Sequence, residues 1–202
     1  MTTGHKGGRP LSFDHDQALQ AATELFWRRG YRAVSASELA EAMGLQRSSF
    51  YNSFGSREAV FREVLARYDA AAPDTALDLV AAGDPVLPRL RAMLREVCRL
   101  RAWDRQARGC LLCNSVAELA GTEPLLGPWL EAAVQARINR FARLIRQAVA
   151  QGEMRPPTDP KALARALAAF VIGLNTLSKT LRDERQLWVM CEAFLAGMGL
   201  DG

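Results

Sequence analysis

The segment RSSFYN, at residues 47–52, holds side chains that could contact a nucleic acid. It offers one guanidinium, two hydroxyls, one phenol and one amide, and no acidic residue occurs between Ala42 and Arg57. Such groups donate hydrogen bonds to phosphates and base edges, whereas a carboxylate would repel the phosphate backbone. The donors that we expect to face outward are Arg47, Ser48, Tyr51 and Asn52. A polar, solvent-exposed helix without any role in DNA binding would have the same composition.

The motif RGCLLCN, at residues 108–114, holds two thiols at a spacing of three residues. On a helix, Cys110 and Cys113 would place both sulfur atoms on one face. We interpret them either as packing residues or as a sensor of oxidants and electrophiles, in which Arg105 and Arg108 would lower a thiol pKa. A metal site is disfavoured, because no histidine or second cysteine pair has a suitable spacing.

The composition predicts a chain that buries a real core. Of 202 residues, 49% are hydrophobic, and the net charge of +4 does not by itself indicate a nucleic-acid partner. The first residues lack the apolar stretch of a secretory signal, and no run approaches the roughly 18 apolar residues of a membrane span. We therefore expect a cytoplasmic protein, in which Cys98 and Cys191 are reduced thiols within a core.

The elements that must position these residues are helices, because the hydrophobic pattern follows a helical period nearly throughout. Ser and Asp residues mark helix starts, and glycines mark helix ends. The expected starts lie at Asp14, Ser35, Gln46 and Ser56, and the expected ends lie at Gly30, Gly44 and Gly55. Further along, Asp84 and Asp159 are expected to cap helices, and a long helix is expected from Pro128 to Gln151.

Residues 35–54 are therefore two short helices joined by a tight glycine turn, which is the helix-turn-helix arrangement. In the second helix, Phe50 and Phe54 are four residues apart, so both face inward and leave the polar donors outside. We predict an all-α protein. An N-terminal arm and a three-helix helix-turn-helix domain span residues 1–68, and a helical ligand-binding and dimerisation bundle spans residues 69–202.

The stretch from Ala18 to Tyr68 resembles the N-terminal domain of TetR/AcrR-type transcriptional regulators. The shared features are a helix that ends in Gly30-Tyr31, a serine cap at residue 35, ELAEAMGL, SSFYNSFGSRE and a following amphipathic helix. One departure is Gln46, where such proteins often carry Ser or Thr as the helix cap. The match is weak over the C-terminal two thirds of the chain, which is the variable part of the family.

The resemblance implies roles for particular residues. Arg47, Ser48 and Ser49 lie where base-edge and nearby phosphate contacts are made, and Tyr51 and Asn52 lie where phosphate contacts are usual. Helix starts and the basic arm also imply contacts with the DNA backbone. The full set that it assigns to DNA binding is Ser35, Arg47, Ser48, Ser49, Tyr51, Asn52, Arg57, Lys6 and Arg9. For the arm, a frayed basic tail is an equal alternative.

The bundle is expected to hold a ligand pocket and a dimer interface. Small residues on one helix and apolar residues on the last helix would pair with their copies in a second chain. The expected dimer residues are Ala166, Ala169, Gly173, Leu187 and Phe194. The expected pocket residues are Met93, Trp103, Cys110, Cys113, Trp129, Phe141, Phe170 and Asn175. Each of these is also consistent with an ordinary core position.

These observations predict a homodimeric repressor that a small hydrophobic or electrophilic effector releases from a palindromic DNA operator. Repression is implied by the resemblance alone. The alternatives are a redox-sensing regulator acting through Cys110 and Cys113, a small cysteine-dependent redox enzyme, and a helical adaptor without a DNA role. The enzyme would need a βαβ frame that the sequence does not predict. We therefore expect neither enzymatic activity nor a cofactor.

Overall fold

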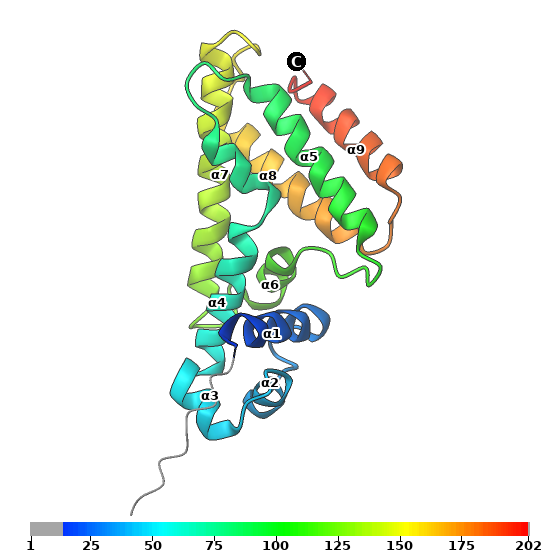
Figure 1. Cartoon of the computed structure of the whole chain (residues 1–202). Coiled ribbons are helices and arrows are strands. Elements are labelled where there is room, and N and C mark those ends of the chain that lie inside the picture. The colour runs from blue at the N-terminus through cyan, green and yellow to red at the C-terminus, as the bar shows by residue number, and fades with distance from the viewer. Residues whose placement is uncertain (1–13, 202) are drawn as a thin grey trace, which may run out of the picture.

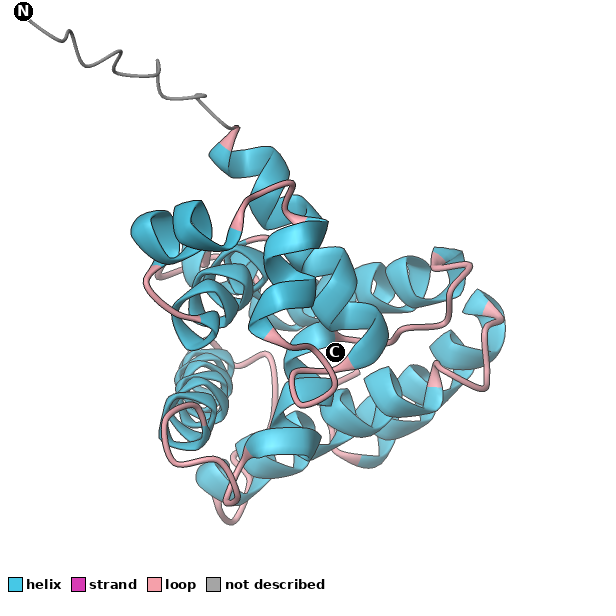
Figure 2. Cartoon of the chain, turned by 90° about the horizontal axis from the view of Figure 1, so that it is seen from below, coloured by secondary structure: helices cyan, strands magenta, loops and turns pink. Residues whose placement is uncertain are grey.

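The computed structural model describes residues 14–201, which form helices and no strand (Figures 1 and 2). In chain order the elements are α1 (His15–Arg29), α2 (Ala36–Ala42), α3 (Arg47–Phe54), α4 (Arg57–Ala70), the 3₁₀ helix η1 (Pro73–Leu79), α5 (Val86–Trp103), α6 (Leu111–Leu119), α7 (Gly127–Ala150), α8 (Pro160–Leu177) and α9 (Glu184–Gly197). The all-α prediction is confirmed. Among the helices of residues 14–201, none combines the length and the apolar composition of a membrane span.

The helix-turn-helix forms because its caps are built into the sequence. The Ser35 hydroxyl accepts a hydrogen bond from the Glu38 amide, and the Glu38 carboxylate accepts one from the Ser35 amide, as expected for a capping box. Gly44 ends α2 with a φ of +69°, and the Leu45 amide donates to the Ala40 carbonyl. Gln46 provides no side-chain cap for α3, in agreement with its weak capping propensity.

Two hydrophobic cores hold the molecule together. The first joins α1–α4 at the lower end of Figure 1, and Phe26, Phe50 and Phe61 lie at its centre. It also includes Leu111 and Leu119 of α6, so α6 completes the core of the helix-turn-helix unit. The boundary expected after residue 68 falls inside α4, which continues to Ala70. It also divides this core, because α6 lies beyond the boundary and still packs in the core. The two-part division of the chain stays a prediction.

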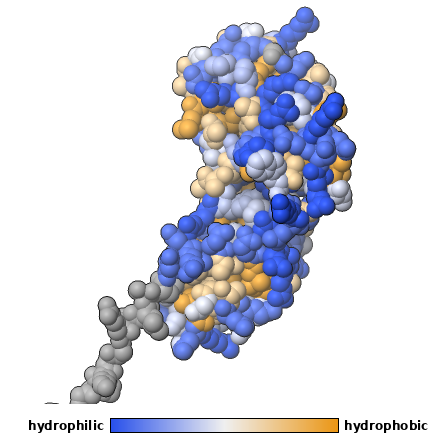
Figure 3. Space-filling model, turned by 45° about the vertical axis from the view of Figure 1, so that its right-hand side comes forward, coloured by the Kyte–Doolittle hydropathy of each residue, from blue (hydrophilic) through white to orange (hydrophobic). Residues whose placement is uncertain are grey.

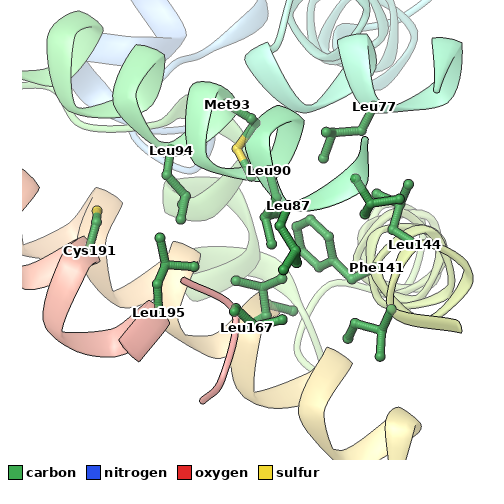
Figure 4. Packing of buried hydrophobic residues seen from close by; sticks show 14 of the residues in the cluster. Leu77, Leu87, Leu90, Met93, Leu94, Phe141, Leu144, Leu167, Cys191 and Leu195 are labelled. Atoms are coloured by element: carbon green, nitrogen blue, oxygen red, sulfur yellow. The ribbon is translucent and has the colours of Figure 1, made fainter. Parts of the chain in front are cut away.

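The second core lies in the upper bundle of α5, α7, α8 and α9. Figure 4 shows leucines of α5 pointing toward Phe141 and Leu144 of α7 and toward Leu167 of α8. The start of α5 differs from the expectation. Its N-cap is Pro85, and the Glu153 carboxylate accepts from the first two amides of the helix, whereas the Asp84 side chain accepts from the Ala81 amide. On the face shown in Figure 3, apolar patches interrupt a mostly hydrophilic surface.

Candidate DNA interface and effector pocket

The outer face of α3 presents a compact set of hydrogen-bond donors. Phe50 and Phe54 are buried beneath it, as the spacing predicts. The exposed residues are Arg47, Ser48, Ser49, Tyr51 and Asn52, and 41% of the Tyr51 surface is accessible. The Arg47 guanidinium lies 5.9 Å from the centre of the Tyr51 ring, which keeps both polar groups on one side of the helix. This surface has the chemistry of a DNA groove contact.

Arg57, which was expected to reach the DNA backbone, faces the protein. Its guanidinium donates to the Val34 carbonyl at 2.8 Å and lies 4.0 Å from the centre of the Tyr31 ring. The Tyr31 hydroxyl in turn donates to Glu58. Arg57 therefore orients the turn before α2. Ser35 is exposed, but its side chain is engaged in the capping box. Lys6 and Arg9 lie outside the described residues.

A cavity of about 550 Å³ lies where the upper bundle meets the helix-turn-helix unit. Its volume falls in the range of small-molecule sites. Six of the expected pocket residues line it, namely Met93, Trp103, Cys110, Cys113, Phe141 and Asn175. Other lining residues, which the sequence pattern did not indicate, include Trp27, Tyr68, Arg101, Asp104 and Arg137. Three of these five carry a charge, and no local motif marks the positions at which a fold will bring charges together.

Two expected pocket residues lie elsewhere, and both predictions are wrong. Trp129 packs against the first core and lines a shallow surface site along α4, because the start of α7 faces the helix-turn-helix unit. Phe170 is partly buried against the second core, where its ring stacks on Phe194 at a centroid distance of 4.1 Å, and it does not line the cavity. The helical periodicity of the sequence indicated that both residues face the protein interior. It could not indicate which interior positions line the cavity.

The two thiols of the cavity have different acidities. Cys110 is the N-cap of α6, and Cys113 follows in its first turn. Hydrogen bonds from Cys113 and the positive charge of Arg101 lower the pKa of Cys110 to about 6, whereas the same pairing and burial raise the pKa of Cys113. Cys110 is therefore the thiol of the pair that favours the anion. The arginine that contributes to the lowered pKa of Cys110 is Arg101, and not the expected Arg105 or Arg108.

Arg108 connects the cavity to α1. Its guanidinium forms ion pairs with Asp104 at 3.1 Å and with Glu24 of α1 at 2.6 Å. It also lies 4.0 Å from the centre of the Trp27 ring, and Trp27 belongs to α1. A ligand that displaces Trp27 or the loop before α6 would therefore act directly on the first helix of the DNA-binding unit.

A second connection runs from α6 to the turn between α1 and α2. The Glu118 carboxylate accepts hydrogen bonds from the backbone amides of Tyr31 at 3.0 Å and Arg32 at 2.7 Å. The Arg32 guanidinium donates to Thr122. Because Cys110 caps the start of α6 and Glu118 lies near its other end, the helix links the cavity to the turn before α2.

The expected dimer residues divide into two groups. Ala169 and Gly173 are exposed on α8, and a side chain added at Gly173 would meet open space. Ala166 and Phe194 are partly buried. Leu187 is wrong as an interface residue, because it is fully buried in the second core of the single chain. The same two helices also carry exposed apolar side chains that the sequence pattern did not indicate, namely Leu177 on α8 and Val189 on α9.

Comparisons with known proteins agree with this architecture. Residues 18–64 match the model of bacterial regulatory proteins of the tetR family, and residues 86–194 match the tetracyclin repressor-like C-terminal domain. A cysteine variant of the TetR family regulator CifR, solved with 26-bp double-strand operator DNA, is 31% identical. The alignment covers 94% of this chain and 98% of that one, with a TM-score of 0.80.

Two further relatives extend this picture. Regulatory protein TetR from Rhodobacter sphaeroides is 27% identical, with a TM-score of 0.74 over 94% of this chain and 99% of that one. The transcriptional repressor ComR of Escherichia coli (strain K12) is 29% identical over 169 residues, which are 83% of this chain and 80% of ComR. Fold and exposed donor helix thus define a helix-turn-helix transcriptional regulator. The chain belongs to the TetR family of bacterial regulatory proteins.

Proposed function

We propose that this protein is a homodimeric repressor that leaves a palindromic operator when a small hydrophobic or electrophilic molecule enters the cavity. The observation that carries the DNA role is the outer face of α3, where exposed donors stand without an acidic neighbour on the helix. The relative CifR was solved on operator DNA, which supports the same use of this face. An operator-binding protein acts where the chromosome lies, so a cytoplasmic location is part of the proposal.

A dimer is proposed because the outer face of α3 is small. One short recognition helix makes few base contacts, and a two-fold pair doubles them at half-sites that lie about one helical turn or more apart. The proposed interface is the outer face of α8 and α9, with Ala166, Ala169, Gly173 and Phe194 as expected. Leu177 and Val189 extend it, because both expose apolar side chains there.

Release from DNA would follow from the contacts between the cavity and α1. A ligand against Trp27 favours one arrangement of α1 and α6, and the Glu118 contacts transmit that arrangement to the helix-turn-helix. If the favoured arrangement alters the distance between the two α3 helices, the dimer no longer matches its half-sites. This is a population shift, and it requires the ligand to bind the two arrangements with different affinity.

The electrophilic branch of the proposal rests on Cys110. Its thiolate would form an S–C bond with the β-carbon of an electrophilic alkene or quinone. The π-electron pair of that alkene passes to the conjugated oxygen, which takes a proton from water. Loss of the thiolate would leave the charge of Arg101 without its neighbour and change the packing at the start of α6.

A redox response of the same cysteines is a second candidate, since both thiols meet at the start of α6. Hydrogen peroxide would oxidise them to a disulfide, and two water molecules would form from the peroxide and the two thiol hydrogens. Mass spectrometry distinguishes the two responses, because alkylation adds the mass of the effector whereas a disulfide removes two hydrogen atoms. If Cys110→Ser and Cys113→Ser leave release by quinones and peroxide unchanged, both thiol mechanisms are wrong.

The DNA role is tested with duplexes from the region upstream of the protein's own gene. Fluorescence anisotropy should show sequence-specific binding that weakens steeply with salt. Arg47→Ala should cost about 1–3 kcal/mol and relax base preference, whereas Tyr51→Phe should weaken binding evenly across sequences. Arg146→Ala is the matched control, because it removes an exposed arginine from α7, away from α3. Equal losses for Arg47→Ala and the control would contradict the proposed reading surface.

A further inference from the structure

Arg101 is a buried cation without a carboxylate partner. Only 7% of its surface is accessible, and its guanidinium donates to the Gly109 carbonyl and to the Tyr68 hydroxyl. No carboxylate of the described residues forms an ion pair with it, and its Nε–H has no acceptor. Burying a charged guanidinium in this state is costly unless an anion compensates it.

The other buried charges of the cavity are compensated. Arg137 is paired with Asp69 and Asp74, and Arg108 is paired with Asp104 and Glu24. The two cavity-lining carboxylates, Asp74 and Asp104, are thus already engaged by arginines. Arg101 is therefore the buried guanidinium of the cavity that no carboxylate engages, and the Cys110 thiolate is the anion with which a ligand would compete for it.

Trp27 supplies a second unsatisfied donor to the same cavity. Within residues 14–201, the buried side-chain nitrogens without a hydrogen-bond partner are Trp27 Nε1 and Arg101 Nε. Both residues line the cavity, although they come from α1 and α5. Buried donors are normally satisfied, so two unsatisfied donors on residues that line one cavity point to a ligand that carries acceptors.

We propose that the effector carries a carboxylate, which Arg101 and Trp27 bind while the apolar walls of the cavity hold its hydrocarbon part. A carboxylate offers several lone pairs and one negative charge, so it compensates the guanidinium and carries acceptors for donors of this kind. The apolar part would lie against side chains such as Met93, Phe141 and Val171, which line the same cavity. The inference rests on the proposed function, since it names the chemistry of the effector for that site.

The position of Trp27 gives this carboxylate a way to act on DNA binding. Arg101 belongs to the ligand-binding bundle, whereas Trp27 belongs to the first helix of the DNA-binding unit. A carboxylate held by both would add a contact between the two parts that exists only when the ligand is bound. Binding would then favour the arrangement in which α1 lies closest to Arg101.

The test compares hexanoate and benzoate with hexanamide and benzamide, which have similar shapes but no charge. Isothermal titration calorimetry on the full chain should show at least one of the two carboxylates binding about tenfold or more tightly than its amide. Arg101→Gln should abolish that preference, and Arg101→Lys, which keeps the charge, should retain part of it. Arg105→Gln is the control, because it removes an exposed arginine at the rim of the same cavity.

Two further variants separate the donors from the thiol. Trp27→Phe keeps an aromatic ring but removes the N–H, so it should weaken carboxylate binding severalfold without changing amide binding. Cys110→Ser removes the competing thiolate and should leave carboxylate binding equal or stronger. Equal affinity for acid and amide, or no binding of either acid by a protein that still binds its operator, would overturn the carboxylate inference alone. If the unmodified protein does not bind operator DNA at all, the proposed function itself is wrong.

Discussion

At the scale of single residues, Cys110 is the thiol of the cavity whose pKa is lowered. A thiol with a pKa of about 6 is largely a thiolate at neutral pH, whereas an ordinary cysteine is largely protonated there. The difference arises from Cys113 and Arg101, which stabilise the anion more than burial destabilises it. Cys110 should therefore react with electrophiles at a pH where its neighbour Cys113, whose pKa is raised, is slow.

We expect the alkylation rate of Cys110 by iodoacetamide to rise with pH, with a midpoint near 6, and to level off above it. The sign follows because only the thiolate reacts, and its fraction increases as pH rises through the pKa. Arg101→Gln and Cys113→Ser should each move the midpoint upward, since each removes a group that stabilises the anion. Mass spectrometry of timed reactions between pH 5 and pH 9 measures this. A midpoint near that of a free cysteine would contradict the assignment.

The sequence predicted the individual donor residues of α3 better than those of the cavity. Phe50 and Phe54 lie four residues apart, and this local spacing suffices to orient Arg47 and Tyr51 outward. The cavity depends on contacts between residues far apart in the chain, such as Arg101 with Tyr68. A hydrophobic pattern predicts that a residue is buried but not which element packs against it, which explains the errors at Trp129 and Phe170.

At the scale of elements, α6 connects the cavity to the helix-turn-helix unit. Its first turn holds Cys110 and Cys113, and its far end holds Glu118 against the turn before α2. The sequence showed the helix starts and ends well, because capping residues and glycines act locally. It did not show that Glu118 or Glu153 would bind amides of other elements, since those contacts form only after the helices have packed.

Replacement of Glu118 tests this connection. Glu118→Gln removes the charge and leaves a single acceptor oxygen for the two amides, so unfolding in urea should show a loss of about 1–3 kcal/mol. Ligand binding to the cavity should change little, but a given ligand occupancy should release less DNA. Glu41→Gln is the matched control, because Glu41 is exposed on α2. Full release of DNA by ligand in Glu118→Gln would show that coupling runs elsewhere, for example through Arg108.

At the scale of the whole molecule, the proposed dimer determines whether two α3 helices can reach two half-sites. The exposed stripe on α8 includes Ala169, Gly173 and Leu177, and a second copy could cover it. Small residues at such a stripe let two helices approach closely. The assembly thus depends on a face that the single chain leaves exposed.

Gly173→Arg should convert the dimer to a monomer and weaken operator binding, while the thermal melting of the monomer stays close to that of the unmodified chain. The added side chain meets open space in the single chain but would clash with a second α8. Size-exclusion chromatography with light scattering measures the assembly. Ala136→Arg on the exposed face of α7 is the control. A stable monomer for the unmodified protein, or a dimer that persists in Gly173→Arg, would exclude this interface.

The first core, which α6 shares with α1–α4, limits how DNA-binding units can be exchanged between members of the family. Leu111 and Leu119 of α6 are buried among the helices of the N-terminal unit, although they lie some distance away in sequence. A chimera that joins residues 1–70 to the bundle of a relative would therefore mix two halves of one core. A chimera should take on a new DNA specificity most successfully when α6 is exchanged together with α1–α4. The unit to exchange is therefore discontinuous in the chain, because α5 lies between α4 and α6.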